Sequence, residues 1–359
     1  MKSNKFSINR RVLFVLVIIA LETIFIKALQ YKILPAKYFY DSSRILDLTN
    51  GISTVTDKSY SFASAFFKSI NIFGFSTLNA WSYFIASCSI SLIIIILSKN
   101  SKISLNNMFF IIASCTLLNI YVFNIGKDFI QFLIFLVIFA ILKCNKISNK
   151  LKLILSSLVL LAEAFVFRVY YAIMAMIMIT IYCIYEKMIK NKIINKKTVF
   201  KIIVLALLLF FIEVFVVQLI SDDNYNAILN ARYIANFSRE SSPDAITIIN
   251  DLLGRNSNFI IFILNYLVNF IRMIFPIELL TKGIKYVAFI FYQLFITFSI
   301  FKTSTKLTER NIMWLITVLS FIMISVIFEP DFGSFIRHES TMFLILFEMS
   351  KLNEEYKEE

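Results

Sequence analysis

The chain has 359 residues, of which 59% are hydrophobic and 16% are charged, and its formal net charge is +13. A soluble domain cannot bury so much apolar surface, and several apolar runs approach or exceed the roughly 18 to 20 residues that cross a bilayer. Such solid runs also exclude a transmembrane β-barrel, whose strands alternate between apolar and polar residues. The sequence therefore predicts an all-α, polytopic transmembrane helix bundle of about ten or eleven spans, forming a single integral membrane domain over residues 1–359.

The positive charge does not indicate nucleic-acid binding. The basic residues stand in short loops between apolar runs, where the positive-inside rule places them. The cysteines lie in or beside apolar runs and form no CxxC motif, so we expect small core residues without disulfide or metal-binding roles. They are Cys88, Cys115, Cys144 and Cys183.

The first span is expected over about residues 12–34, directly after Arg10 and Arg11, which places the N-terminus in the cytoplasm. It contains Glu22 and Lys27 and lacks a small-residue cleavage site, so it is predicted to be an uncleaved span and not a signal peptide. Pro35 ends it. Residues 35–79 then form an outer loop, in which 62–78 is a candidate interfacial helix.

The following spans are expected at about 81–97, 108–125, 129–142 and 153–167, then in a segment that returns to about residue 185, and at 202–220. Lysine-rich loops over 143–152 and 186–201 mark the cytoplasmic side. On the outer side we expect tight hairpins at 126–128 and 167–171. A long outer loop, 221–258, is predicted to form a short helical lid or cap.

Residues 259–280 are apolar enough to cross the membrane, but they contain Asn265, Asn269, Arg272 and Pro276. If they cross, the later lysines and arginines fall outside. If they re-enter or lie on the outer interface, the later lysines and arginines lie on the cytoplasmic side. The distribution of lysine and arginine favours this second path. Spans at 286–301 and 312–328 would follow. Residues 329–340 then face the outer side, and a last span begins near residue 335.

This topology separates lysine from arginine. Cytoplasmic loops carry mostly lysine, whereas the outer side carries arginine, the better group for bidentate phosphate binding. An outer arginine cluster therefore predicts an anionic ligand, with ordinary balancing of loop acids as the alternative. The outer arginines are Arg44, Arg168, Arg232, Arg239, Arg255 and Arg337.

Three charged clusters at span ends have structural alternatives. Gly126-Lys127-Asp128 can be a plain hairpin with an Asp helix cap. Arg168 can pair with Glu163, although five residues exceed the usual helical spacing. The charges of 337–339 can simply lie among headgroups at a helix start. Acids inside apolar runs (Glu22, Glu163 and Glu213) are candidates for buried pairs or interfacial positions.

The layout resembles bacterial polysaccharide polymerases of the Wzy and EpsG-like type, which act in O-antigen, capsule and exopolysaccharide biosynthesis. The resemblance lies in the polytopic bundle, the long outer loop in the second half, and three short motifs. These are GKD at 126–128, FRVYY at 167–171 and FGSFIRHE at 332–339.

The resemblance implies a multi-pass glycosyltransferase of the bacterial cytoplasmic membrane. It would join polyprenyl-diphosphate-linked oligosaccharide units on the outer leaflet, with the lipid diphosphate as leaving group and a hydroxyl of the incoming unit as acceptor. Such chemistry needs no cofactor and no metal. The sequence has no P-loop, no dinucleotide fingerprint and no metal-ligand spacing. The implied partners are the lipid-linked oligosaccharide and the bilayer, with a chain-length regulator and a flippase as further candidates, and no nucleic acid.

The chemistry requires fixed cations for the diphosphate and a base for the acceptor hydroxyl. We assign the diphosphate to Arg337, Arg168, Lys127 and Arg44. The candidate catalytic residues are His338 and Glu339, with Asp128 and Asp331 as second choices for the base. A carboxyl group near apolar surface has a raised pKa, which suits a base near neutral pH.

Two other functions stay open. A membrane-embedded glycosyltransferase that uses polyprenyl-phosphate sugars would carry an acidic pair in the first outer loop, but Asp41 and Asp47 are separated. A flippase or exporter of lipid-linked glycan would line the middle of the membrane with charges, whereas here they gather at outer ends of spans. A purely structural membrane protein leaves Arg168 and the 337–339 cluster unexplained.

Overall fold

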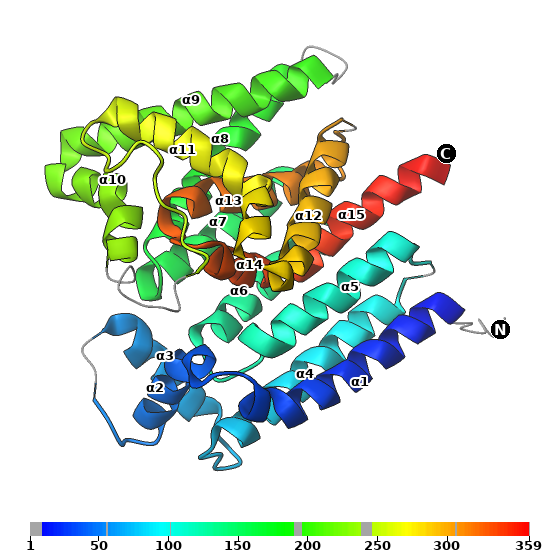
Figure 1. Ribbon diagram of the computed structural model, residues 1–359. Helices are drawn as coiled ribbons and strands as arrows, with labels where there is room; N and C mark the ends of the chain where they lie inside the picture. The colour runs from blue at the N-terminus through cyan, green and yellow to red at the C-terminus, as the bar shows by residue number, and fades with distance from the viewer. Residues whose placement is uncertain are drawn as a thin grey trace. The chain divides into compact units, whose positions relative to one another are not determined.

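The computed structural model describes residues 9–54, 57–100, 102–189, 196–237, 246–305 and 307–358. Within these ranges every named element is a helix, which confirms the predicted all-α class (Figure 1). Arg239 and Pro243, which belong to the predicted anionic-ligand cluster and lid, lie outside the described residues.

The predicted membrane character is confirmed by helix length and composition. Among the described residues, six helices are long and apolar enough to cross a membrane: Arg10–Ile33, Leu78–Ser98, Leu105–Val122, Tyr170–Met188, Lys201–Leu219 and Ile284–Thr305. Phe259–Ile274 and Ile312–Phe328 are shorter apolar helices. The total of ten or eleven spans stays a prediction.

The chain forms two compact units. Unit 1 comprises Met1–Leu136 and Ser340–Phe343, and unit 2 comprises Val137–Glu339 and Leu344–Glu359. Helix α6 (Lys127–Lys143) begins in unit 1 and ends in unit 2. Each unit is therefore described separately.

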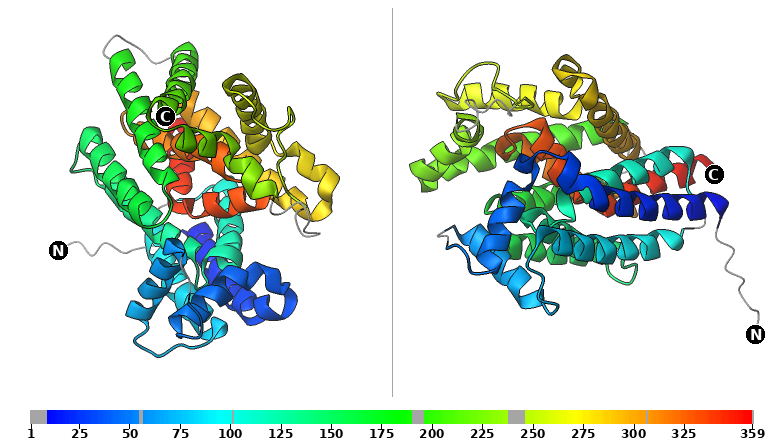
Figure 2. Two further views of the ribbon diagram at one scale, coloured as in Figure 1. Left: turned by 90° about the vertical axis from the view of Figure 1, so that its left-hand side faces the viewer. Right: turned by 60° about the horizontal axis from the view of Figure 1, so that its bottom comes forward.

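In unit 1, α1 (Arg10–Ile33) packs against α4 (Leu78–Ser98) and α5 (Leu105–Leu117), and the three lie side by side in every view (Figure 1, Figure 2). Asn9 caps α1 by accepting a hydrogen bond from the Arg11 backbone N–H. Leucines, isoleucines and phenylalanines along α1 are exposed, as a lipid-facing side requires.

The predicted outer loop 35–79 contains a short 3₁₀ turn (Ala36–Phe39), α2 (Tyr40–Thr49) and α3 (Lys58–Ile70). Helix α3 overlaps the candidate interfacial helix over 62–78 but begins earlier, because Asp57 caps it through the Ser59 backbone N–H. Phe67 lies in an aromatic cluster with Trp81 and Phe129, at ring-centroid distances of 5.3 and 6.1 Å. This cluster ties α3 to α4 and α6. The interfacial position of α3 stays a prediction.

A lysine lies buried in the middle of unit 1. Lys27 of α1 is 2% exposed, and its Nζ donates to Asn119 O at 2.5 Å and Phe123 O at 2.7 Å. These carbonyls belong to a π-helical turn, η2 (Leu118–Val122), and to the residue after it. The π-helical turn leaves its carbonyl groups in need of donors, and Lys27 supplies them. Lys27 is therefore not part of a carboxylate pair with Glu22.

In unit 2, α13 (Ile312–Phe328) forms the core, and almost all of its residues are buried. Helix α8 (Tyr170–Ile189) packs against α7 (Asn149–Val166), α9 (Lys196–Ile220) and α13. Helix α10 (Asp222–Phe237) lies within the predicted outer loop 221–258 and packs against α9 and α13. Two 3₁₀ turns (Ile277–Lys282 and Ile284–Tyr286) lead into α12 (Val287–Thr305).

Helix α11 (Phe259–Ile274) occupies the ambiguous segment 259–280. Its 16 residues extend about 24 Å, which is less than the roughly 30 Å hydrocarbon core. Asn265 and Asn269 are buried, whereas apolar residues such as Ile260 and Ile271 are exposed. The apolar side of α11 thus faces outward. This arrangement supports an interfacial or re-entrant position, which stays a prediction.

The expected continuous last span from near residue 335 is wrong. Helix α14 (Phe332–Ser340) ends after nine residues, and α15 (Phe343–Glu358) begins separately. The break follows Ser340 and Thr341, whose hydroxyl groups compete with helical hydrogen bonding. Residues 332–340 therefore belong to a short helix of their own, and 329–331 lead into it.

Candidate functional site

The centre of the site in unit 2 is a contact between Glu329 and His338. Helix α13 ends at Phe328, and the extended residues that follow lead to Asp331, which caps α14 by accepting from the Ser334 backbone N–H at 2.8 Å. This turn returns α14 beside the end of α13. The Glu329 Oε1 and His338 Nδ1 atoms lie 2.7 Å apart, and both side chains are buried.

Arg168 reaches the other side of the imidazole. It stands in the tight turn between α7 and α8, and its Nη2 lies 3.1 Å from His338 Nε2. Its Nη1 donates to the Tyr170 hydroxyl at 2.9 Å. The Tyr170 ring stacks on Phe328 at 4.9 Å between centroids, so α8 and α13 hold this turn in place. Arg337 Nη2 also approaches His338 Nε2, at 3.5 Å.

These contacts fix the tautomer of His338. A guanidinium group carries only donors, so the Nε2 atom that faces Arg168 must be the acceptor. On the opposite side of the ring, Nδ1–H donates to the Glu329 carboxylate. The imidazole is thus held between the Glu329 carboxylate and the two arginines.

Glu329 is ionised in this arrangement. Burial alone would raise its pKa, but the contact with His338 and the charge of Arg168 outweigh burial and lower the pKa of Glu329 to about 2. A buried carboxylate on the far side of an imidazole stabilises the imidazolium form when Nε2 takes up a proton. The cluster can therefore accept a proton and bind an anion at the same place.

The long outer loop packs directly on this segment. Ile248 pairs with Asp331 in an isolated antiparallel bridge, the Ile249 N–H donates to Pro330 O at 3.0 Å, and the Phe332 N–H donates to Thr247 O at 3.0 Å. Gly333 leaves room for two side chains of this contact. A Cβ atom at this position would lie 3.1 Å from Asp331 Oδ1 and 3.4 Å from Thr247 Oγ1.

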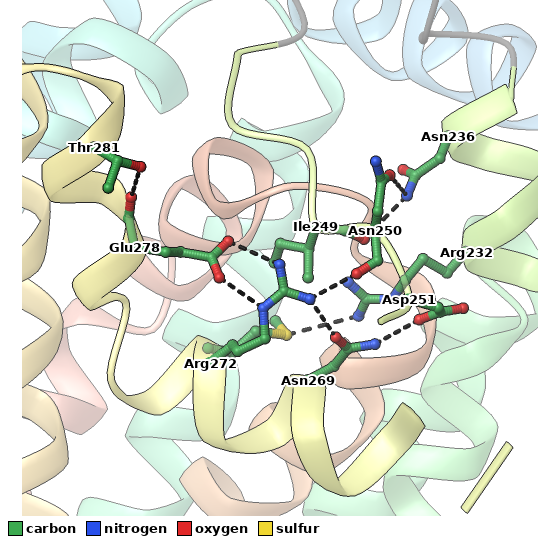
Figure 3. Close-up of polar contacts among 10 residues, drawn as sticks. Arg232, Asn236, Ile249, Asn250, Asp251, Asn269, Arg272, Glu278 and Thr281 are labelled. Atoms are coloured by element: carbon green, nitrogen blue, oxygen red, sulfur yellow. Dashed lines mark hydrogen bonds and ion pairs between the residues drawn. The ribbon is translucent and has the colours of Figure 1, made fainter. Parts of the chain in front are cut away.

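A second polar network anchors the same loop to α11 (Figure 3). Arg272 forms two parallel bonds to the Glu278 carboxylate, at 2.7 and 2.9 Å, and also donates to Asn250 O at 2.6 Å. Asn269 donates to Asp251 at 2.6 Å. Burial raises the pKa of Asp251, and the charge of Arg232 opposes this effect. The two networks together fix residues 247–251 between α11 and the Glu329 segment.

The outer arginines have different surroundings. Arg232 is buried and donates to Val326 O in the last turn of α13, so its role is structural support of the site. Arg255 donates to Asn230 at 3.2 Å. Arg168 and Arg337 gather at His338. Among the described outer arginines of unit 2, only Arg168 and Arg337 approach His338, so within this unit we assign the predicted anionic site to these two.

Unit 1 contains a separate cationic cluster around Tyr60. Arg44 lies over the Tyr60 ring with its guanidinium carbon 4.4 Å from the centroid, and Lys127 Nζ lies 3.8 Å from the same centroid. The Tyr60 hydroxyl donates to Asp41. Two of the predicted diphosphate-binding residues are therefore brought together. Asp128 is half-buried in the first turn of α6.

Glu339 and Glu163 lie apart from the contacts of His338. Glu339 is fully buried, and its Oε1 lies 3.5 Å from Gln293 of α12, on a different side of α14 from His338. The carboxylate oxygens of Glu163 have no hydrogen-bond partner among the described residues. Arg168 contacts His338 and Tyr170 through its side chain, and the structural alternative of an Arg168–Glu163 ion pair stays a prediction.

Sequence reasoning missed Glu329 and the Tyr170 hydroxyl as members of the site. The signal for Glu329 was present: an acid directly before a proline and an Asp cap, on the return path to the single histidine. Its partner is nine residues away, which no local helical spacing predicts.

Comparison with protein-family models, with curated proteins and with solved structures gives no match, so the assignment of a function depends on the chemistry of these residues.

Proposed function

We propose that the protein polymerises polyprenyl-diphosphate-linked oligosaccharide units at the outer leaflet of a bacterial cytoplasmic membrane. The observation that carries this proposal is the Glu329–His338–Arg168 chain, in which one imidazole nitrogen faces a carboxylate and the other faces two arginines. A glycosyl transfer with a diphosphate leaving group needs both halves: a proton acceptor and fixed positive charge.

The arginines bind the lipid diphosphate. Negative charge accumulates on its oxygen atoms as the glycosidic bond breaks, and Arg168 and Arg337 stabilise that charge. Both are partly buried, which strengthens their interaction with an anion relative to water. When the diphosphate draws these guanidinium groups toward itself, His338 Nε2 loses its donors and becomes available as a base.

The bond changes follow from this arrangement. The acceptor hydroxyl oxygen attacks the anomeric carbon of the donor sugar, and a new carbon–oxygen bond forms. The bond from that carbon to the diphosphate oxygen breaks, and the leaving group keeps the electron pair. The hydroxyl proton passes to His338 Nε2, and Glu329 stabilises the resulting imidazolium through Nδ1–H.

The remaining assigned residues keep proposed roles. Lys127 and Arg44 of unit 1 gather at Tyr60 and are proposed to contribute to diphosphate binding. Asp128 is an alternative base. Glu339 meets Gln293 and is proposed to be less suited to the role of base than His338.

The test uses a strain in which the chromosomal gene is deleted and variants are supplied on a plasmid. Arg168→Ala and Arg337→Ala are expected to abolish long glycan chains while the protein stays in the membrane at wild-type abundance. Arg255→Ala is the matched control, since Arg255 is an exposed arginine of the same unit that bonds to Asn230. The control is expected to retain long chains.

The lipid-linked intermediate distinguishes the candidate functions. Accumulation of single lipid-linked units on the outer leaflet in the deletion strain supports a polymerase. Accumulation on the inner leaflet would indicate a flippase or exporter. Absence of a complete lipid-linked unit would indicate an earlier glycosyltransferase that uses polyprenyl-phosphate sugars. Long chains in the Arg168→Ala strain would overturn the site assignment.

A further inference from the structure

Unit 2 contains a cavity of about 800 Å³ at the end of its helices opposite to His338. Helices α7, α8 and α13 connect the two places. Arg168 follows the end of α7, Tyr170 begins α8 and Glu329 follows α13, whereas the cavity lies at the start of α7, the end of α8 and the start of α13. The end of α6, the α6–α7 turn and α15 complete its wall. It is therefore a different site from the proposed catalytic cluster.

Charged side chains of both signs line the cavity, with a surplus of one positive charge. Among the described lining residues the cations are Lys143, Lys150, Lys152 and Arg310, and the carboxylates are Glu186, Glu309 and Glu348. Two ion pairs lie within the wall: Lys143 Nζ is 2.6 Å from the Glu348 carboxylate, and Lys150 Nζ is 3.4 Å from that of Glu186. The cavity can therefore take one negative charge and become neutral.

Aromatic side chains line the same cavity. Trp314, Tyr182 and Tyr185 are buried and belong to the lining. The Trp314 ring packs against Phe139 at 5.9 Å between centroids. Tryptophan and tyrosine beside basic residues are typical of the headgroup level of a membrane, where one end of the ring is apolar and the other is hydrated.

The flanking charges indicate the leaflet. Lys146 lies in the α6–α7 turn between the lining residues, and Lys187 lies in the last turn of α8. Short lysine-rich connections of this kind lie on the cytoplasmic side. That leaflet carries the anionic phospholipids, and basic pockets between transmembrane helices on this side bind their headgroups.

We propose that this cavity binds the phosphodiester headgroup of an anionic phospholipid from the cytoplasmic leaflet. A phosphodiester carries one negative charge, which balances the surplus of the lining. A phosphate monoester carries about two at neutral pH and would leave the cavity overcharged. The acyl chains remain in the bilayer beside the apolar helices. The inference does not depend on the proposed polymerase activity, since it requires no turnover.

The two tryptophans of the chain make a direct test possible, because one of them, Trp314, lines the cavity and the other, Trp81, belongs to unit 1. The protein is reconstituted in phosphatidylcholine nanodiscs that contain increasing fractions of brominated phosphatidylglycerol or brominated phosphatidylcholine. The fluorescence of Trp314 is obtained as the fluorescence of the wild-type protein minus that of Trp314→Phe. We expect brominated phosphatidylglycerol to quench this signal at a several-fold lower lipid fraction than brominated phosphatidylcholine does.

Charge variants test the lining. Lys152→Gln combined with Arg310→Gln is expected to reduce the preference for phosphatidylglycerol by about fivefold per cation removed. Lys146→Gln is the matched control, because Lys146 is an exposed lysine of the same turn that does not line the cavity. It is expected to keep the wild-type preference. If the double variant does not fold, the comparison of the two brominated lipids in the wild-type protein decides by itself.

Two results would overturn the proposal. Equal quenching of Trp314 by the two brominated lipids would mean that the cavity has no preference for an anionic headgroup. Displacement of phosphatidylglycerol by soluble glycerophosphoglycerol at comparable concentration would mean that a free phosphodiester is the ligand and the lipid is not. A cavity variant that loses the lipid preference but still polymerises glycan shows that this site is separate from the catalytic one. A catalytic variant that keeps the lipid preference but does not polymerise shows the same.

Discussion

His338 Nδ1 lies 2.7 Å from Glu329 Oε1, and both side chains are buried. The contact joins the residue after α13 to the second turn of α14, so the turn through Pro330 and Asp331 sets its geometry. Because Arg168 occupies the opposite nitrogen, the imidazole is held between a fixed anion and a fixed cation.

Glu329→Gln is expected to reduce polymerisation strongly without changing the shape of the site. The amide oxygen can still accept from Nδ1–H, but it lacks the charge that stabilises the imidazolium. General-base assistance contributes about 10²- to 10⁴-fold, so we expect a loss within that range. The measurement is chain growth on purified lipid-linked units in proteoliposomes.

Asp223→Asn is the control for this experiment, since Asp223 is an exposed acid in the first turn of α10. It is expected to polymerise at the wild-type rate. If Glu329→Gln elongates chains as fast as the control does, Glu329 has no part in proton transfer.

The same carboxylate makes stability depend on pH. The pKa of Glu329 is lowered from an ordinary 4.5 to about 2 in the folded protein. A lowered carboxyl pKa stabilises the folded state above the unfolded pKa, and this stabilisation is lost as pH falls from about 4.5 toward 2. The loss is of the order of a few kcal/mol, since each pKa unit corresponds to about 1.4 kcal/mol.

Thermal unfolding in detergent at about pH 5.5 and about pH 3 measures this effect. Other carboxyl groups also titrate in this interval, so the informative quantity is the wild-type drop in Tm minus that of Glu329→Gln. We expect a larger drop for the wild type. Equal drops would show that Glu329 is not the stabilising anion.

The sequence predicted part of this site for a physical reason. The positions of Arg168 and Arg337 were predicted from their place at the ends of apolar runs, where a charge can reach water without crossing the apolar core. Both were therefore predicted at one end of the bundle, and the structure brings them to His338. The all-α class and the long apolar helices follow equally directly from the apolar runs.

The partner of His338 was not predictable in the same way. Glu339 is adjacent in sequence, but successive residues of an α-helix point about 100° apart, so it faces Gln293 instead. Glu329 becomes the partner only because Pro330 and Asp331 turn the chain back on itself. The capping of η2 by Lys27 depends likewise on tertiary contacts that local spacing does not encode.

Membrane orientation gives a further prediction. In a variant lacking the native cysteines, Asn145→Cys marks the cavity end of unit 2 and Asp223→Cys marks the first turn of α10, which follows α9. Both positions are exposed. Lysine-rich connections place the first in the cytoplasm and the second outside. An impermeant maleimide applied to intact spheroplasts should label Asp223→Cys at once and Asn145→Cys only after lysis. Labelling in the reverse order would place the Glu329 segment inside and exclude an outer-leaflet reaction.

The last prediction concerns Lys27, whose ammonium group holds the end of α5 through carbonyl groups. It donates to Asn119 O, Phe123 O and the side chain of Asn124, at 2.5, 2.7 and 3.1 Å. Lys27→Met keeps the length of the side chain but leaves these buried acceptors without their donor, at a cost of about 1 to 3 kcal/mol for each one that stays unsatisfied. We expect a fall in Tm of several degrees.

Lys32→Met is the matched control, because Lys32 is an exposed lysine in the last turn of the same helix. Its Tm is expected to stay within about one degree of the wild type, as is usual for a surface substitution. The turn formed by Leu118–Val122 leads into the 126–128 hairpin, so Lys27→Met should also increase hydrogen exchange at Lys127 and Asp128. A wild-type Tm and unchanged exchange in Lys27→Met would mean that α5 and the hairpin hold their geometry without the buried lysine.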